Sequence, residues 1–266
     1  MRPLRALVPA AALAGLILAP TAASAQDATG TVTVVHGIPD TTVDVFVNGD
    51  LTLDDFEFGT VTDPLELPAG DYTFDITAPD AADNSDPILT ADATLEAGAN
   101  VSAVAHLTEG GDPTATLFVN DIDTIAAGEA RVTVRHTAAA PAVDILAGGD
   151  VLVPDLSNPN EAVADVPAGD YDLAINAAGT DTEVLALPGT TLAEGTNTIA
   201  YAVGSLDGGS FEILVQAISG LHDAPEGVPA GDAGLADSAP FGAIVLGLMG
   251  LGALALAARR PATERN

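Results

Sequence analysis

Two histidines and two aspartates recur at one spacing and are the residues best suited to acid–base chemistry. His36 stands eight positions before Asp44, and His136 stands eight positions before Asp144. A histidine that is oriented by a carboxylate can act as a general base or help to bind a metal. No residue of nucleophile type repeats with either pair, so each histidine is more simply explained as a core side chain that hydrogen-bonds a neighbouring loop. An exported hydrolase that uses the two pairs is kept as an alternative.

Acidic loops offer a second chemistry, because calcium prefers hard oxygen ligands. Asp80, Asp83, Asn84 and Asp86 lie together between two prolines, and residues 50–57 hold a second acidic cluster. Neither cluster has the spacing of an EF-hand loop, and such clusters also arise by chance in a chain this acidic. The sequence therefore predicts no obligatory cofactor, with calcium at the first cluster as the candidate ligand.

Arg131 and Arg135 are the only arginines between residues 6 and 258, and the chain has no lysine. Both arginines are an odd number of residues from His136, and successive side chains of a strand point to opposite faces. We therefore expect the arginines on the outward face of this strand, paired with neighbouring acids. Asp121 and Asp123 precede them and could be bridged by a cation.

Composition limits the functions that the chain can have. The formal net charge is −31 over 266 residues, and cysteine is absent. Between residues 26 and 258, two arginines stand against 37 acidic side chains. Such a surface repels nucleic acid and anionic lipid headgroups and attracts cations. Disulfides are excluded, and zinc sites are disfavoured because the only nitrogen ligands would come from four histidines.

The chain contains the same module twice. Residues 131–136 repeat residues 31–36 at an offset of 100, and residues 167–171 repeat residues 68–72 at an offset of 99. Each copy has about 95 residues, which is a size at which a domain can bury a core of its own.

Both copies have the residue pattern of β-strands. Tyr72, Phe74 and Ile76 alternate with polar residues, and Gly, Pro, Asn and Asp separate short apolar runs. No stretch of the exported part has sustained helical periodicity. We therefore expect an all-β fold of two tandem antiparallel β-sandwiches, immunoglobulin-like or transthyretin-like, at residues 30–128 and 129–220. Further strands are expected near residues 88–95, 101–107 and 114–119.

The two ends of the chain have the composition of membrane signals. Residues 1–25 have a basic start, an apolar stretch and a small-residue cleavage site, which together predict a signal peptide followed by a short segment at 26–29. A polar stalk at 221–240 leads to an uncharged stretch, 241–258, which is long enough for a transmembrane helix. The basic tail, 259–266, should stay cytoplasmic, which predicts a single-pass protein of the cell membrane with extracellular modules. The Leu-Pro-x-Thr-Gly motif of wall sorting is absent.

Three features of the first copy resemble an exported bacterial family: Val-x-Val-x-His at residues 32–36, Val-Asp-Val at 43–45 and Pro-Ala-Gly-Asp-Tyr at 68–72. This family is catalogued as domain of unknown function 4397, and the resemblance extends over roughly residues 30–220 as two copies. It implies an extracytoplasmic, β-rich module that often occurs in tandem, and it carries no activity that can be transferred. The second copy departs from the first at residues 137–140, where alanines replace the earlier loop.

These features favour a non-catalytic, membrane-anchored surface protein that displays two acidic modules for binding or envelope organisation. Its expected partners are the membrane, through the C-terminal helix, and an unknown extracellular or cell-wall component, with no nucleic acid. A calcium- or cation-dependent binding module is the alternative, and the exported hydrolase is the second alternative.

Overall fold

The computed structural model describes residues 28–222 of the chain. The predicted signal peptide, 1–25, lies outside these residues. So do nearly all of the stalk, the predicted transmembrane helix at 241–258 and the tail at 259–266. Within residues 28–222 the structure has no helix with the length and hydropathy that crossing a bilayer requires.

The described chain is all-β, as the alternating pattern predicted, and it contains sixteen strands. In chain order they are β1 (Thr29–His36), β2 (Thr42–Val47), β3 (Asp50–Glu57), β4 (Leu65–Pro68), β5 (Gly70–Thr77), β6 (Leu89–Leu95), β7 (Asn100–Leu107), β8 (Pro113–Val119), β9 (Glu129–His136), β10 (Val143–Ala147), β11 (Asp150–Leu156), β12 (Glu161–Pro167), β13 (Gly169–Ala177), β14 (Glu183–Leu192), β15 (Asn197–Val203) and β16 (Glu212–Ile218).

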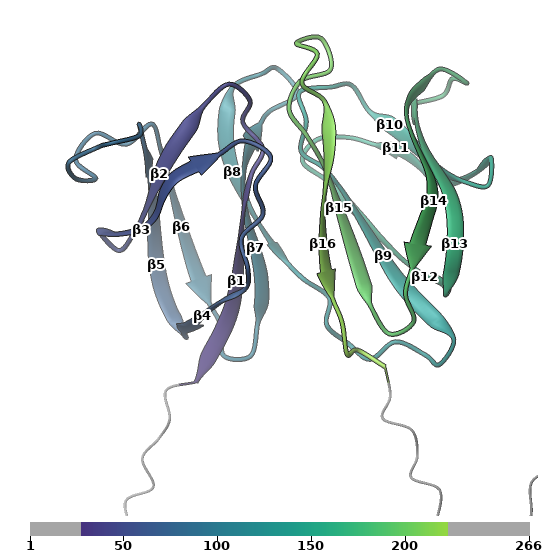
Figure 1. The fold of residues 1–266 in the computed structure, drawn as a ribbon, viewed down its shortest axis with the longest axis horizontal. Coiled ribbons are helices and arrows are strands. Elements are labelled where there is room, and N and C mark those ends of the chain that lie inside the picture. Colours follow the sequence, from purple (N-terminus) through teal and green to yellow (C-terminus); the bar gives the residue numbers. More distant parts are fainter. Residues whose placement is uncertain (1–27, 223–266) are drawn as a thin grey trace, which may run out of the picture. The chain divides into compact units, whose positions relative to one another are not determined.

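The strands form four sheets of four, and the second pair of sheets repeats the first (Figure 1). The first module, β1–β8, has the strand orders β4-β1-β7-β8 and β3-β2-β5-β6. The second module, β9–β16, has the orders β12-β9-β15-β16 and β11-β10-β13-β14. Each label rises by eight, so the duplication seen in the sequence is also a duplication of topology.

Two strand pairs differ from the antiparallel prediction. β1 runs parallel to β7, and β9 runs parallel to β15. In each module the intervening chain builds the whole of the second sheet before it returns. A return over that distance can bring the strand back in either direction, whereas a tight hairpin such as β2–β3 permits only the antiparallel one.

Each module has its own hydrophobic core between its two sheets. In the first module Val32 and Val34 of β1 pack against Val45 of β2 and Phe74 of β5. In the second module Val132 and Val134 of β9 pack against residues that include Ile145, Ile175 and Leu192. A fully buried side chain of this kind contributes about 1.5–3 kcal/mol.

A third core joins the two modules. Val35, Val104 and Phe118 of the first module cluster with Ile199, Tyr201 and Val203 of the second. Five of these six side chains are no more than 2 % exposed. The central strands β1 and β9 are therefore buried on both faces, one toward their own module and the other toward the neighbouring module.

Tyr72 and Tyr171 occupy equivalent positions, as the repeat predicted, but they are half-buried rather than enclosed in the core. Each hydroxyl donates a hydrogen bond of 2.6 Å to the carbonyl of the proline four residues earlier, Pro68 or Pro167. The ring thus fastens the turn that leads into β5 or β13.

We expect Tyr72→Phe to lower the free energy of unfolding by about 1 kcal/mol, because it removes one hydrogen bond and keeps the ring. Urea denaturation measures this free energy. Tyr171→Phe should lower it by a similar amount, because it removes the equivalent hydrogen bond. A phenylalanine variant as stable as the parent would show that the hydroxyl does not hold the turn.

Candidate functional site

The structure does not join the repeated histidines to the repeated aspartates. His36 Nε2 lies 3.0 Å from the carbonyl of Thr41, and its Nδ1 accepts a hydrogen bond from the Ile38 amide at 3.3 Å. The ring is buried and stacks on Phe56, with 5.6 Å between centroids. His136 repeats the loop contact, with Nε2 2.9 Å from the Pro141 carbonyl. Both rings hold a neighbouring loop onto the core.

The two aspartates hold the backbone of the neighbouring strand. Asp44 Oδ1 accepts the amide of Asp55 at 2.9 Å, and Asp144 Oδ1 accepts the amide of Asp155 at 2.8 Å. Asp55 and Asp155 have φ angles of 49° and 55°, where the register of the hairpin shifts. A second bond, from the amide of Gly179, helps to lower the pKa of Asp144. The recurring carboxylate therefore supports an irregular hairpin twice.

The predicted calcium residues make short local contacts. The Asn84 amide donates to Asp75 at 2.7 Å, and Asp83 accepts the Ser85 backbone amide at 3.0 Å. The Ser85 side chain, and then this backbone amide, lower the pKa of Asp83 by hydrogen bonding. Asp80 stands in the left-handed region with φ 59°. No group of three or more His, Asp or Glu side chains in the described chain is placed to hold a metal ion. Calcium at Asp80, Asp83, Asn84 and Asp86 stays a prediction.

The two acidic clusters predicted from the sequence lie close to one another. Partial desolvation raises the pKa of Asp55, and the negative charges of Asp54 and Asp80 raise it further. The separate stretches at 50–57 and 80–86 thus share one region of negative potential.

Arg135 is charged and nearly fully buried, with 1 % of its surface exposed. Its Nε donates to Glu161 at 2.8 Å, and its Nη1 donates to the Tyr201 hydroxyl at 2.9 Å. The guanidinium carbon lies 4.4 Å from the centroid of the Phe118 ring in the first module. The predicted pairing with an acid is confirmed, but the outward face of β9 is covered by the first module.

A chain of buried polar side chains continues from Arg135 across the junction of the two modules. The Tyr201 hydroxyl donates to Gln216 Oε1 at 2.6 Å, and Gln216 Nε2 donates to Thr33 Oγ1 at 3.1 Å. Ser102 Oγ lies 2.8 Å from the Tyr201 hydroxyl and 3.0 Å from Gln216 Oε1. Thr33 and Ser102 belong to the first module, so the bonds connect both halves in a region from which water is excluded.

Both ends of the junction are also tied. At one end the Asn158 side-chain amide donates to the carbonyls of Leu107 and Ala138, at 2.8 and 2.6 Å, and the Gly204 amide donates to the Gly37 carbonyl at 3.2 Å. Since Leu107 and Gly37 are in the first module, these bonds again join the two halves.

At the other end Arg131 fixes the connector between the modules. Its Nη1 contacts Asp121 Oδ1 at 2.7 Å and the Asp123 carbonyl at 3.1 Å, while its Nε donates to Asp165 at 2.8 Å. The hydrogen bond with Asp165 raises the pKa of Arg131. The cation predicted between Asp121 and Asp123 is therefore supplied by the chain itself.

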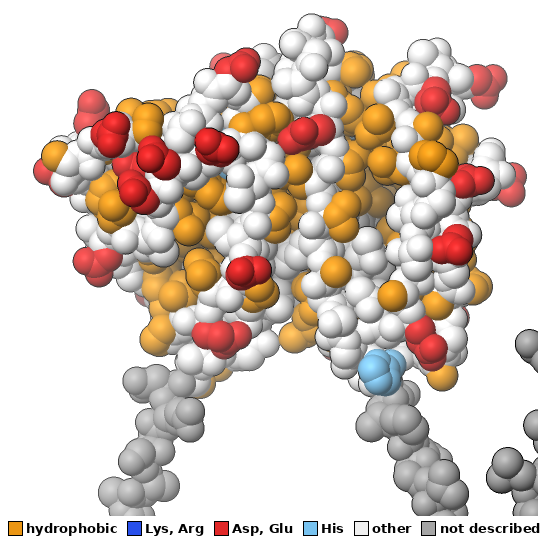
Figure 2. All heavy atoms as spheres, in the orientation of Figure 1, with side chains coloured by type: hydrophobic (Ala, Val, Ile, Leu, Met, Phe, Trp, Pro, Cys, Tyr) orange, Lys and Arg blue, Asp and Glu red, His pale blue; other side chains and the backbone are white. Residues whose placement is uncertain are grey.

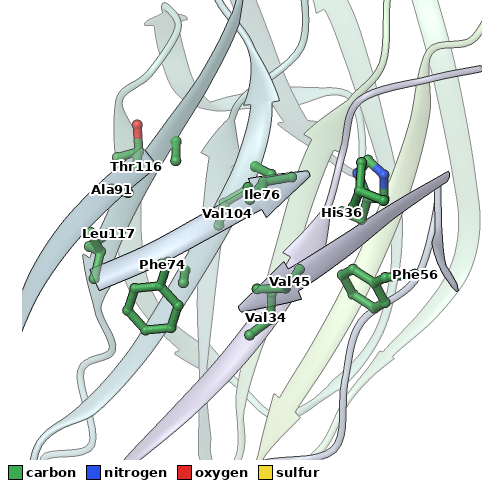
Figure 3. Close-up of a pocket in the computed structure, with 14 residues that line it drawn as sticks. Val34, His36, Val45, Phe56, Phe74, Ile76, Ala91, Val104, Thr116 and Leu117 are labelled. Atoms are coloured by element: carbon green, nitrogen blue, oxygen red, sulfur yellow. The ribbon is translucent and has the colours of Figure 1, made fainter. Parts of the chain in front are cut away.

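An apolar cleft opens into the core of each module at equivalent positions. In the first module it is lined by Val34, Val45, Phe74 and Leu117 among others and has a volume of about 30 Å³. Figure 3 shows these side chains, from both sheets, around the cleft. This space is a packing gap that could hold little more than one water molecule.

The cleft of the second module is larger, at about 210 Å³. Ile145, Leu173 and Val215 line it where the first module has Val45, Phe74 and Leu117. The smaller Leu173 leaves room that the Phe74 ring fills. In addition, β6 packs along β8, and no comparable contact joins β14 to β16 in the described residues. Figure 2 shows hydrophobic side chains in a hollow between β16 and β14.

The fold and the junction define an all-β protein in which an eight-stranded unit occurs twice. The model of the family described as "Domain of unknown function (DUF4397)" matches residues 30–146 of the chain. This confirms the resemblance of the first module, and the match ends within β10 of the second. No curated protein matches the chain.

Acid should destabilise the protein through its buried histidines. Burial lowers the pKa of His36, of His106 and of His136, whose Nδ1 is enclosed without a hydrogen-bond partner in the described structure. The unfolded chain then binds more protons than the folded one below pH ~6.5, so stability is lost as the pH falls below that value. The loss is about 1.4 kcal/mol per pH unit for each such histidine until its lowered pKa is reached.

Urea denaturation between about pH 7 and pH 5 measures this slope. His106→Gln should reduce it, whereas His222→Gln, at an exposed position, should leave it unchanged. If the slope of His106→Gln equalled that of the parent, the acid sensitivity would have to come from groups other than His106.

Proposed function

We propose that the protein is a non-catalytic, membrane-anchored surface protein that presents two family modules as one rigid unit for binding or envelope organisation. Both modules are taken as β-sandwiches of the immunoglobulin-like or transthyretin-like kind, with the second as a diverged copy of the first. The observation that carries the proposal is the buried polar junction around Arg135. Two modules joined only by a flexible connector would leave the guanidinium in water, whereas here the contact between the modules buries it.

The surface of the described chain supports a display function. Its two arginines are both committed to ion pairs, so the exposed charges of the described residues are acidic. A surface of one sign keeps the unit soluble and sets the charge of the partners that it can approach. The repeated histidines and aspartates act on the fold, and the exported hydrolase therefore has less support than the display of a binding surface.

A cation-dependent binding module is the second candidate. It is favoured by the raised pKa of Asp55 beside Asp54 and Asp80, because a cation bound there would relieve the repulsion among these carboxylates.

Rigidity of the pair can be tested at the junction. We expect Arg135→Leu to cost about 1.5–3 kcal/mol, because it removes the charged hydrogen bonds to Glu161 and to the Tyr201 hydroxyl. Amide exchange resolved by module should then show the two halves opening separately, whereas the parent opens as one unit. Thr182→Asp changes the net charge by the same amount at an exposed site and is the control. Independent opening in the parent would contradict the rigid unit.

Anchoring can be tested by ending the chain after Pro240. The shortened protein should move from the membrane fraction to the medium, because residues 241–258 supply the proposed span. Immunoblots of the two fractions measure this, with the full chain as the reference. Retention of the shortened chain in the membrane would place the anchor elsewhere.

A further inference from the structure

β16 is one of the two least protected edge strands of the four sheets. Six edge strands carry a proline or an acidic residue in their interior, whereas β8 and β16 have one only at the first position, and β8 is packed along β6. β16 has one acid, Glu212 at its first position, and then the residues Ile-Leu-Val-Gln-Ala-Ile. Proteins commonly protect edge strands with charge, proline or bulges, because a bare edge pairs with another strand. An unprotected edge at this place in the fold is therefore suited to strand addition.

The large cleft of the second module lies directly beside this edge. Val215 of β16 lines the cleft and is 58 % exposed, although it stands where Leu117 is packed in the first module. The walls are apolar except for threonine side chains such as Thr190 and Thr198. In an added strand alternate side chains point to the same face. One set could thus enter the cleft while the backbone pairs with β16.

Charge identifies the kind of strand that fits. Asp63 lines a second hollow beside Val215 and Ala217, and Glu212 begins the strand. Arg131 and Arg135 are both engaged in ion pairs, so no arginine of the described chain offsets these acids. A second copy of this chain would be repelled by its own charge, whereas a basic segment would be attracted.

We propose that the cleft between β14 and β16 receives an extended, basic peptide segment of a partner protein, which adds a strand to β16 and inserts alternate apolar side chains beside Val215. This inference rests on the proposed function and names the site and partner class for it. At the equivalent place the first module is closed, because β6 packs along β8 and Phe74 fills the space. Backbone hydrogen bonds would supply affinity, and the cleft would supply the preference for apolar side chains.

The test uses the full chain in phosphatidylcholine nanodiscs, or in buffer where the chain is recovered from the medium. The probe is a fluorescent synthetic peptide that alternates valine and threonine between lysines at both ends. Fluorescence anisotropy should show saturable binding, and amide exchange should slow along β16 when the peptide is bound. The same peptide with a central proline should bind at least tenfold more weakly, because proline removes a ladder hydrogen bond.

Two variants of the chain distinguish the site from general attraction to an acidic surface. Val215→Lys places a charge at the cleft and should weaken binding at least tenfold. Val119→Lys makes the same change at a 71 % exposed valine on β8 and should weaken it by less than twofold. Equal losses in both variants would overturn the site. A second outcome would also overturn the proposal. If dodecanol displaces the peptide and the bound peptide does not slow amide exchange along β16, the cleft binds an aliphatic ligand and no strand is added. Failure of anchoring would change only the fraction in which the chain is recovered, so the two failures can be told apart.

Discussion

The burial of the Arg135 guanidinium is the constraint on which the arrangement of the two modules depends. A buried charge is tolerated only when its hydrogen bonds and its counter-charge are in place. Glu161 and Tyr201 come from the second module, but the ring of Phe118 that covers the guanidinium comes from the first. The guanidinium is therefore withdrawn from water only when the two modules are together. Each module has its own core. The relative position of the two cores therefore depends on the burial of this charged side chain as well as on apolar packing.

The duplication supplied two similar faces, and the differences between them made the junction specific. Val35 pairs with Val104 in the first module, and at the equivalent positions of the second Arg135 pairs with Tyr201. The same divergence reaches the clefts, because Leu173 in place of Phe74 leaves the second module open where the first is closed.

Much of the fold could be predicted from the sequence, because alternating side chains and turn residues are local signals. Strands such as β5, β6, β7 and β8 lie where the pattern placed them. β3 and β4 were missed, since acidic residues and a proline obscure their alternation. The structural role of the histidines, as core side chains that hydrogen-bond a neighbouring loop, was predicted correctly. The role of Asp44 was not, because it depends on a backbone amide eleven residues away.

The junction itself could not be predicted, because the outward positions of β9 have the composition of a solvated strand face. The symmetry of that contact limits how large such an assembly can grow. Both modules use the same face of the corresponding sheet, β4-β1-β7-β8 against β12-β9-β15-β16. A contact of this isologous kind closes on itself, whereas head-to-tail contacts leave a free face at each end for another unit. A third copy joined to this chain would find no equivalent face to occupy, so the mode of packing itself sets the number of modules in the unit at two.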